Sequence, residues 1–254
     1  RRLFDIIADD LLAENPYAAD HIESITARLS QAADEALQGA LYIARRLEDP
    51  DGEVPLCIIA MGKTGGGELN YVSDVDVMYV LADSAPAEDT EVTRLRLERA
   101  TRIASLVASI CSSPGKEPPL WSVDANLRPE GRDGALVRTI DSYRTYWERW
   151  AQNWEFQALL KARPCAGDME VGQRFLECAA PFIWEASARP GFVDDVRSMR
   201  AQVENSVPPN VRDSELKLGV GGLRDIEFSI QFLQLVHGRN DIQIRQRSTL
   251  GALG

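Results

Sequence analysis

The sequence predicts an α+β fold, in which a few short strands lie between two mostly helical ends. Three observations support this class. Short apolar runs of strand length are confined to the middle of the chain, apolar residues recur at helical spacing on either side, and glycines and prolines separate the runs. We therefore expect an N-terminal helical segment at 1–48, an α/β core at 49–139 and an all-helical C-terminal domain at 140–254.

The first elements follow from local spacing. Residues 1–48 are expected to be helical, because apolar residues recur at helical intervals between Ile25 and Leu41. Prolines and a glycine predict a turn at 49–55, and the apolar run 56–61 predicts a buried strand. A glycine-rich loop is then expected at 62–70.

Beyond that loop, strand and helix patterns alternate. We expect a second strand at 74–81 and a third at 120–128, with a long helix at 91–112 between them. One more short strand is expected at 135–139. Helices are expected over most of the remaining chain, at 140–163, 168–187, 190–206 and 222–238.

Composition excludes several classes of protein. The chain has 28 Lys and Arg against 39 Asp and Glu, a net charge of −11. This balance argues against coating nucleic acid or docking on an anionic membrane, since both need a positive surface. No run approaches the ~18 apolar residues of a membrane span. The four cysteines lack zinc-ligand spacing and indicate core residues of a cytoplasmic protein, so any metal must be held by oxygen.

Three aspartates are the candidate catalytic residues and metal ligands. Asp74 and Asp76 share one strand face because strand side chains alternate, and the apolar side chains between and after them, at 75, 77, 79 and 81, are expected on the core face. Asp124 lies on the polar face of the third strand. Carboxylates this close repel each other, and a divalent cation offsets the repulsion. If the two strands are neighbours, the cluster suits Mg²⁺, with Mn²⁺ as the second candidate ion, and displacement at phosphorus.

Glycines and cations near these strands are candidates for binding phosphate or nucleotide. Consecutive glycines let backbone N–H groups approach a phosphate, and Arg224 begins a helix after glycines, a natural anion site. Arg128 is expected on the strand face of Asp124. A plain turn at Lys63 and a solvated helix face at Arg224 are the alternatives. The candidates are Lys63, Gly65, Gly66, Ser73, Arg128, Lys161, Arg163, Lys217, Arg224 and Glu227.

A Gly-Gly pair followed after seven residues by Asp-Val-Asp-Val resembles the signature of the DNA polymerase β-like nucleotidyltransferases. That resemblance implies a small mixed sheet with helices, whose aspartates bind the metals for nucleotidyl transfer. Four runs are similar to a more specific family, glutamine synthetase adenylyltransferase, also called the adenylyl-removing enzyme: 62–76, 123–129, 154–163 and 217–228. They occur in the family's order, and the resemblance extends over nearly the whole chain. Thr64 is a departure, because this family usually has an aliphatic residue there.

Proteins of that family hold two nucleotidyltransferase halves, so the resemblance implies that this chain is a fragment. One half transfers AMP from ATP to a tyrosine of glutamine synthetase, and the other removes it by phosphorolysis, releasing ADP and so controlling nitrogen assimilation. The runs 65–70 and 221–228 are more similar to the N-terminal, removing half. The adenylylating half is one alternative, and a non-catalytic module that docks glutamine synthetase or a PII signal protein is another. A nucleic-acid polymerase is disfavoured by the net charge.

Overall fold

The chain forms two compact units in its computed structural model. The described residues are 2–84, 89–114, 121–211 and 214–253. The first unit consists of Arg1–Arg149 and Lys161–Cys178, and the second of Trp150–Leu160 and Ala179–Gly254. These boundaries differ from the expected domains, because the N-terminal helices and the segment at the start of the expected C-terminal domain pack with the sheet.

Helices make up most of both units. In the first unit they are α1 (Arg2–Leu11), α2 (Ala19–Glu48), α3 (Gly62–Gly66), α4 (Thr90–Ser112), the 3₁₀ turn η1 (Gly131–Asp133), α5 (Ile140–Arg149) and the beginning of α7 (Met169–Glu185). In the second they are α6 (Asn153–Leu159), the end of α7, the 3₁₀ turn η2 (Ala186–Ala188), α8 (Phe192–Asn205) and α9 (Leu223–His237). Among the described residues, no helix has both the length and the apolarity needed to cross a membrane.

The first unit is built around a mixed sheet, which confirms the predicted fold class. Its described strands are β1 (Leu56–Ala60), β2 (Val75–Leu81), β3 (Val123–Asp124), β4 (Val137–Thr139) and β5 (Arg163–Gly167). β1 pairs antiparallel with β2 on one side and β5 on the other. β3 and β4 both run parallel to β2, β3 along its beginning and β4 along its end.

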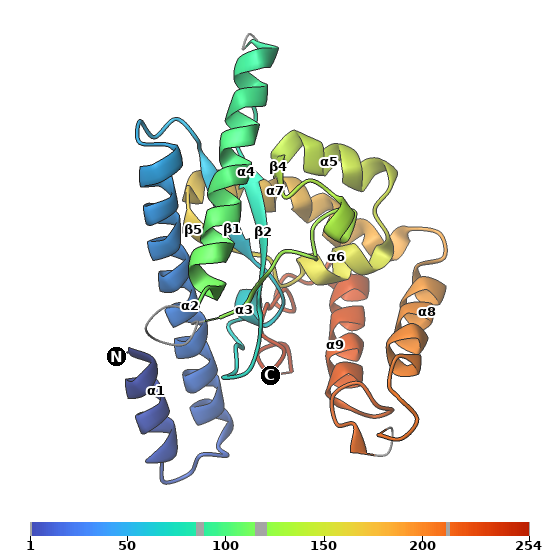
Figure 1. The fold of residues 1–254 in the computed structure, drawn as a ribbon. Helices are drawn as coiled ribbons and strands as arrows, with labels where there is room; N and C mark the ends of the chain where they lie inside the picture. The colour runs from blue at the N-terminus through green and yellow to red at the C-terminus, as the bar shows by residue number, and fades with distance from the viewer. Residues whose placement is uncertain (1, 85–88, 115–120, 212–213, 254) are drawn as a thin grey trace. The chain divides into compact units, whose positions relative to one another are not determined.

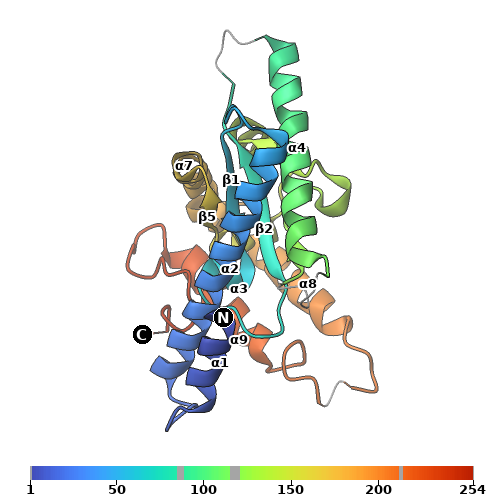
Figure 2. The ribbon, with the colours of Figure 1, turned by 60° about the vertical axis from the view of Figure 1, so that its left-hand side comes forward.

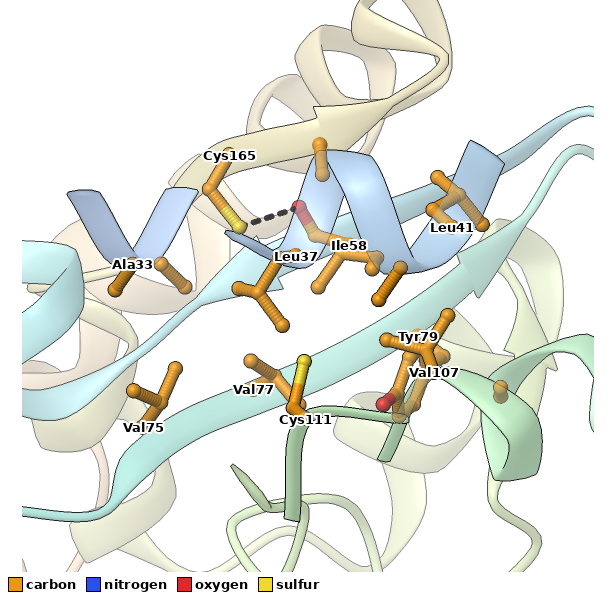
Figure 3. Close-up of a cluster of buried hydrophobic side chains, with 14 of the residues drawn as sticks. Ala33, Leu37, Leu41, Ile58, Val75, Val77, Tyr79, Val107, Cys111 and Cys165 are labelled. Carbon is orange, nitrogen blue, oxygen red and sulfur yellow. Dashed lines mark hydrogen bonds between the residues drawn. The ribbon is translucent and has the colours of Figure 1, made fainter. Parts of the chain in front are cut away.

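The hydrophobic core lies between one face of this sheet and the helices α2 and α4, which run along it (Figures 1 and 2). Because strand side chains alternate, Val75, Val77 and Tyr79 of β2 all point into this core, as their spacing predicted. Figure 3 shows them beside Leu37 of α2 and Cys111 of α4. The same alternation turns the side chains between them, including that of Asp76, toward the other face of the sheet.

The start of α7 packs on the opposite face of the sheet. Gly172 lies so close to β1 and β5 that an added Cβ would be 2.7 Å from both Cys57 Sγ and a side-chain carbon of Pro164. Tyr143 of α5 and Phe175 of α7 meet edge to face, with ring centroids 5.2 Å apart. The sheet is thus covered on both faces, which holds its strands in fixed register.

Two expected helices are interrupted. Residues 1–48 form α1 and α2 rather than one continuous helix, because Pro16 lies between them and its ring does not fit a helix interior. The helix expected at 140–163 was also wrong in its extent: α5 and α6 are separate, and β5 begins at Arg163. The helices expected at 91–112, 168–187, 190–206 and 222–238 are confirmed within a few residues at their ends.

The described part of the second unit consists of helices and loops. Gln157 Nε2 of α6 donates a hydrogen bond to Gln231 Oε1 of α9 at 2.8 Å. Asn153 Nδ2 of α6 donates to Asp195 Oδ2 of α8 at 2.6 Å. These polar contacts tie α6 to the two longer helices, and they explain why the short α6 belongs to this unit rather than to the sheet.

Candidate functional site

Two of the predicted carboxylates lie on neighbouring strands. Asp76 of β2 is in register with Asp124 of β3 in a parallel pair, so both side chains share a face and their Cα atoms are about 4.8 Å apart. The third strand therefore lies beside the second, which is the condition on which the proposed carboxylate site depended. Asp124 Oδ1 accepts a hydrogen bond from the backbone N of Asn126 at 2.7 Å, which fixes the orientation of this carboxylate.

The third predicted carboxylate, Asp74, is exposed and lies one residue before β2. Within the described ranges, no group of three or more His, Cys, Asp and Glu side chains is close enough to hold a metal ion. Mg²⁺ in proteins is usually held by one or two carboxylates together with water and substrate phosphates, not by a complete protein cage. The in-register pair of Asp76 and Asp124 therefore has the donor chemistry that Mg²⁺ requires.

A single helical turn, α3, joins β1 to the segment before β2, beside both strands (Figure 1). A glycine-rich loop was expected at 62–70, and this expectation was wrong for 62–66, which form the turn that Gly67 ends in the left-handed region at φ 73°. At Gly62, φ is 52°, and an added Cβ would overlap Asp76 Oδ2. Only a residue without a side chain satisfies both conditions, so Gly62 allows the backbone to lie directly against the Asp76 carboxylate.

The other predicted residues of this segment lie between β1 and the site carboxylates. Gly65 packs against backbone atoms, since an added Cβ would overlap the carbonyl oxygen of Lys161 and lie 2.6 Å from that of Ala60. Gly66 and Ser73 are half-buried. Lys63 Nζ is 2.8 Å from the side-chain oxygen of Asn70, in the amide orientation that satisfies both groups. The backbone of α3 thus contacts β2, and Gly62 lies directly against the Asp76 carboxylate.

Two predicted phosphate-binding cations instead form ion pairs within the first unit. Lys161 Nζ donates to Glu68 Oε2 at 2.7 Å, and Lys161 is only 5% exposed. Arg163 pairs with Asp34 of α2 at 2.7 Å. Burial raises the pKa of Asp34, and the hydrogen bond from Arg163 partly offsets that rise. Sequence analysis missed both carboxylates, although Glu68 lies within the glycine motif and a buried lysine requires a paired charge.

Arg128 closes the loop after β3. Its guanidinium donates to the backbone oxygens of Ala125 at 2.8 Å, Arg132 at 3.1 Å and Gly134 at 3.1 Å. The expected position of Arg128 on an extended strand face was wrong, because β3 ends at Asp124 and the chain turns after it. These three hydrogen bonds stiffen the loop that begins at Asp124. Residues 115–120, which include the expected first residue of that strand, lie outside the described residues.

The segment that leads to Asp74 is anchored to the N-terminal helices. Tyr71 Oη donates to Asp10 Oδ2 of α1 at 2.7 Å, and His21 Nε2 of α2 lies 2.9 Å from Asp10 Oδ1. The hydrogen bonds from Tyr71 and then His21 lower the pKa of Asp10. This contact limits the movement of the chain just before β2.

The remaining predicted residues lie in the second unit. Arg224 pairs with Glu227 across one turn of α9 at 3.0 Å, and Lys217 is exposed in the preceding loop. The backbone N–H groups of Leu223 and Arg224 donate to the carbonyls of Leu216 and Lys217, each at 2.9 Å. Two of the first-turn N–H groups that were expected to bind an anion are therefore already satisfied by backbone oxygens.

A mixed sheet with paired aspartates on neighbouring strands, beside a glycine turn, is consistent with a nucleotidyltransferase core. The chain is matched over residues 2–178 by the family model described as glutamate-ammonia ligase adenylyltransferase, and it belongs to that family. Residues 197–253 also match the model described as GlnD PII-uridylyltransferase.

Several similar proteins are named bifunctional glutamine synthetase adenylyltransferase/adenylyl-removing enzyme. The relative from Bifidobacterium longum subsp. infantis is 48% identical over 100% of this chain and 23% of its own length. Those from Cutibacterium acnes and Leifsonia xyli subsp. xyli are 49% and 48% identical over 100% of this chain, and over 25% and 26% of their own lengths. The chain thus spans about a quarter of the length of these relatives.

Proposed function

We propose that this chain carries an adenylyl-removing active site, which acts on the adenylylated tyrosine of glutamine synthetase by metal-dependent phosphorolysis. The in-register pair of Asp76 and Asp124 is the observation that carries the proposal. Two carboxylates on one sheet face repel each other, and a divalent cation bound by them would offset that repulsion and supply positive charge for a phosphate. Membership of the adenylyltransferase family supports nucleotidyl chemistry at this position.

The proposed reaction balances without a further reactant. An oxygen of inorganic phosphate attacks the phosphorus of the AMP group, and the bond between that phosphorus and the tyrosine oxygen breaks. The products are ADP and unmodified tyrosine, whose oxygen takes up the proton that the phosphate releases. Because phosphate is already a competent nucleophile at neutral pH, this chemistry needs no general base.

Charge neutralisation is the main demand, since an anion attacks a phosphodiester that is also an anion. Asp76 and Asp124 are proposed to hold Mg²⁺ or Mn²⁺, and the bound ion would neutralise charge on the attacking and leaving oxygens. Gly62 and its neighbours keep bulky side chains away from the carboxylates, so that phosphate groups can approach them. Lys63, which follows Gly62 directly, is a proposed phosphate-binding cation of this turn.

Removal is proposed over addition because the motifs 65–70 and 221–228 are more similar to the removing half of the family. Both directions occur in the printed names of the relatives, so adenylylation of glutamine synthetase from ATP is the second candidate. A PII signal protein is proposed as a regulatory partner, on the basis of the family resemblance alone.

A two-way assay with Mg²⁺ tests the proposal. In one reaction the chain receives adenylylated glutamine synthetase and phosphate, and ADP is measured. In the other it receives unmodified glutamine synthetase and ATP, and pyrophosphate is measured. ADP that disappears on metal chelation supports removal, whereas pyrophosphate alone contradicts it in favour of the adenylylating direction. The absence of both products, from a chain that still binds glutamine synthetase, contradicts catalysis and favours a docking module.

A further inference from the structure

Two ion pairs lie on either side of the glycine turn α3. Arg163 Nη2, whose guanidinium also pairs with Asp34, donates to the carbonyl oxygen of Thr64 at 3.1 Å. Lys161 Nζ donates to Glu68 at 2.7 Å, just beyond the end of the turn. Both cations come from residues 161–163, which lead into β5, so one short segment of chain contacts the turn at two points.

Other contacts fix the same turn. Met61 N donates to the carbonyl oxygen of Asp76 at 2.9 Å, which ties the beginning of the turn to β2. Leu69 N donates to Ser30 Oγ of α2 at 3.1 Å, which ties its end to the core helix. The backbone of Gly65 lies against the carbonyl of Lys161 between these points. The turn is therefore held at both ends and in the middle.

Burial limits which groups the ammonium of Lys161 can contact. Its side chain is 6% exposed and that of Glu68 is 18% exposed, so the pair is largely removed from water. A buried charge needs a partner, and removing one member of such a pair leaves the other charge uncompensated. The ammonium of Lys161 is therefore bound by a carboxylate of its own unit. This differs from the direct phosphate contact that the sequence suggested for it.

We infer that Lys161 and Glu68 are positioning residues, whose ion pair holds α3 where Gly62 lies against the Asp76 carboxylate. The pair sets the distance between the backbone of the turn and the site carboxylate, and so the space in which a phosphate group lies. The kinetic consequence rests on the proposed function, whereas the structural consequence does not.

Kinetics distinguish positioning from direct phosphate binding. The variants are Glu68→Gln, Lys161→Met and the double variant. The control is Glu48→Gln, which removes a carboxylate from the ion pair with Arg102 on the surface of the same unit. Each single variant is expected to lower kcat about 100-fold, because displacement of a site by ~1 Å has an effect of that order. The KM for phosphate is expected to change by less than about 2-fold, because uniform binding is retained.

The double variant is expected to be no slower than either single variant, because the two residues act as one unit. If Lys161 binds phosphate directly, Lys161→Met raises the KM for phosphate while Glu68→Gln leaves kcat unchanged. That pattern would overturn the inference. An effect of equal size in Glu48→Gln would also overturn it, since the loss would then not be specific to the turn.

Hydrogen exchange tests the same inference without activity. In the chain without substrate, backbone amides of residues 65–69 are expected to exchange at least about 10-fold faster in Glu68→Gln and Lys161→Met than in the wild type, through local opening. Glu48→Gln is expected to match the wild type. If a single variant does not fold, the double variant replaces both buried charges and is expected to fold, and its exchange is measured instead. Unchanged exchange at 65–69 overturns the inference, whereas a wild-type chain that forms no ADP contradicts only the proposed function.

Discussion

Replacing Gly65 with alanine tests the packing of the glycine turn against the sheet. An added Cβ at this position would overlap the carbonyl oxygen of Lys161 and lie 2.6 Å from that of Ala60. Both obstacles are backbone atoms, and neither can rotate away as a long side chain can. The matched substitution is Gly39→Ala in α2, where an added Cβ meets nothing within 4 Å.

The two substitutions are expected to change the free energy of unfolding in opposite directions. Alanine is favoured over glycine in a helix by about 0.5 to 1 kcal/mol, which is the expected gain for Gly39→Ala. At Gly65 the same gain is outweighed by overpacking, whose cost is about 3 kcal/mol or more when backbone has to shift. The net loss is therefore about 2 to 3 kcal/mol. For a chain of this size that lowers Tm by roughly 4 to 12 °C.

Urea unfolding followed by far-ultraviolet circular dichroism measures both variants. The midpoint of the transition is expected to fall for Gly65→Ala and to rise slightly for Gly39→Ala, with the slope unchanged in both. If Gly65→Ala is as stable as the wild type, α3 does not pack on β1 as described. The account of a turn held tightly beside Asp76 would then be refuted.

Three further predictions concern the side chains of Thr64, Asp76 and Asp10. Thr64 is fully buried, and its hydroxyl has no hydrogen-bond partner among the described residues. Thr64→Val is therefore expected to raise the free energy of unfolding by about 1 kcal/mol, measured by urea unfolding. A lower free energy of unfolding would contradict the unpaired hydroxyl. Asp76→Asn is expected to lower ADP release about 100-fold or more with unchanged circular dichroism, and full turnover would exclude it as a metal ligand. The pKa of Asp10 is lowered in the folded state by Tyr71 and His21, so its contribution to stability is present above about pH 4 and lost as pH falls through the folded pKa. In an acid titration Tyr71→Phe is expected to lose less stability than the wild type between neutral and low pH, and identical losses would contradict this linkage.

Local periodicity predicted the elements that depend on neighbours in sequence. Alternation along β2 placed Val75, Val77 and Tyr79 in the core and Asp76 on the other face, and the structure confirms it. The same reasoning failed at β3, where alternation was extended well beyond Asp124. A polar–apolar pattern does not show where a strand ends when the end is set by a loop that folds back. Here the loop after β3 is held by hydrogen bonds from the guanidinium of Arg128.

Partners that are distant in sequence could not be predicted. Arg163 pairs with Asp34 across 129 positions, and Lys161 with Glu68 across 93. In the sequence alone, both cations were candidate phosphate ligands, because a positive charge suits an anion. Which negative group a cation meets is decided by strand pairing and helix packing. Neither strand pairing nor helix packing can be deduced from the spacing of residues along the chain.

The sequence by itself determined the α+β class, the order of its main elements, and the aspartates and glycines of the site, because these depend on short-range alternation and on residue chemistry. Only the tertiary structure decided that β5 joins the sheet, that the glycines form a turn against Asp76, and that Lys161 is buried on Glu68. The physical reason is that a buried charge takes the role set by its nearest opposite charge, and folding brings that charge close from a distant part of the chain.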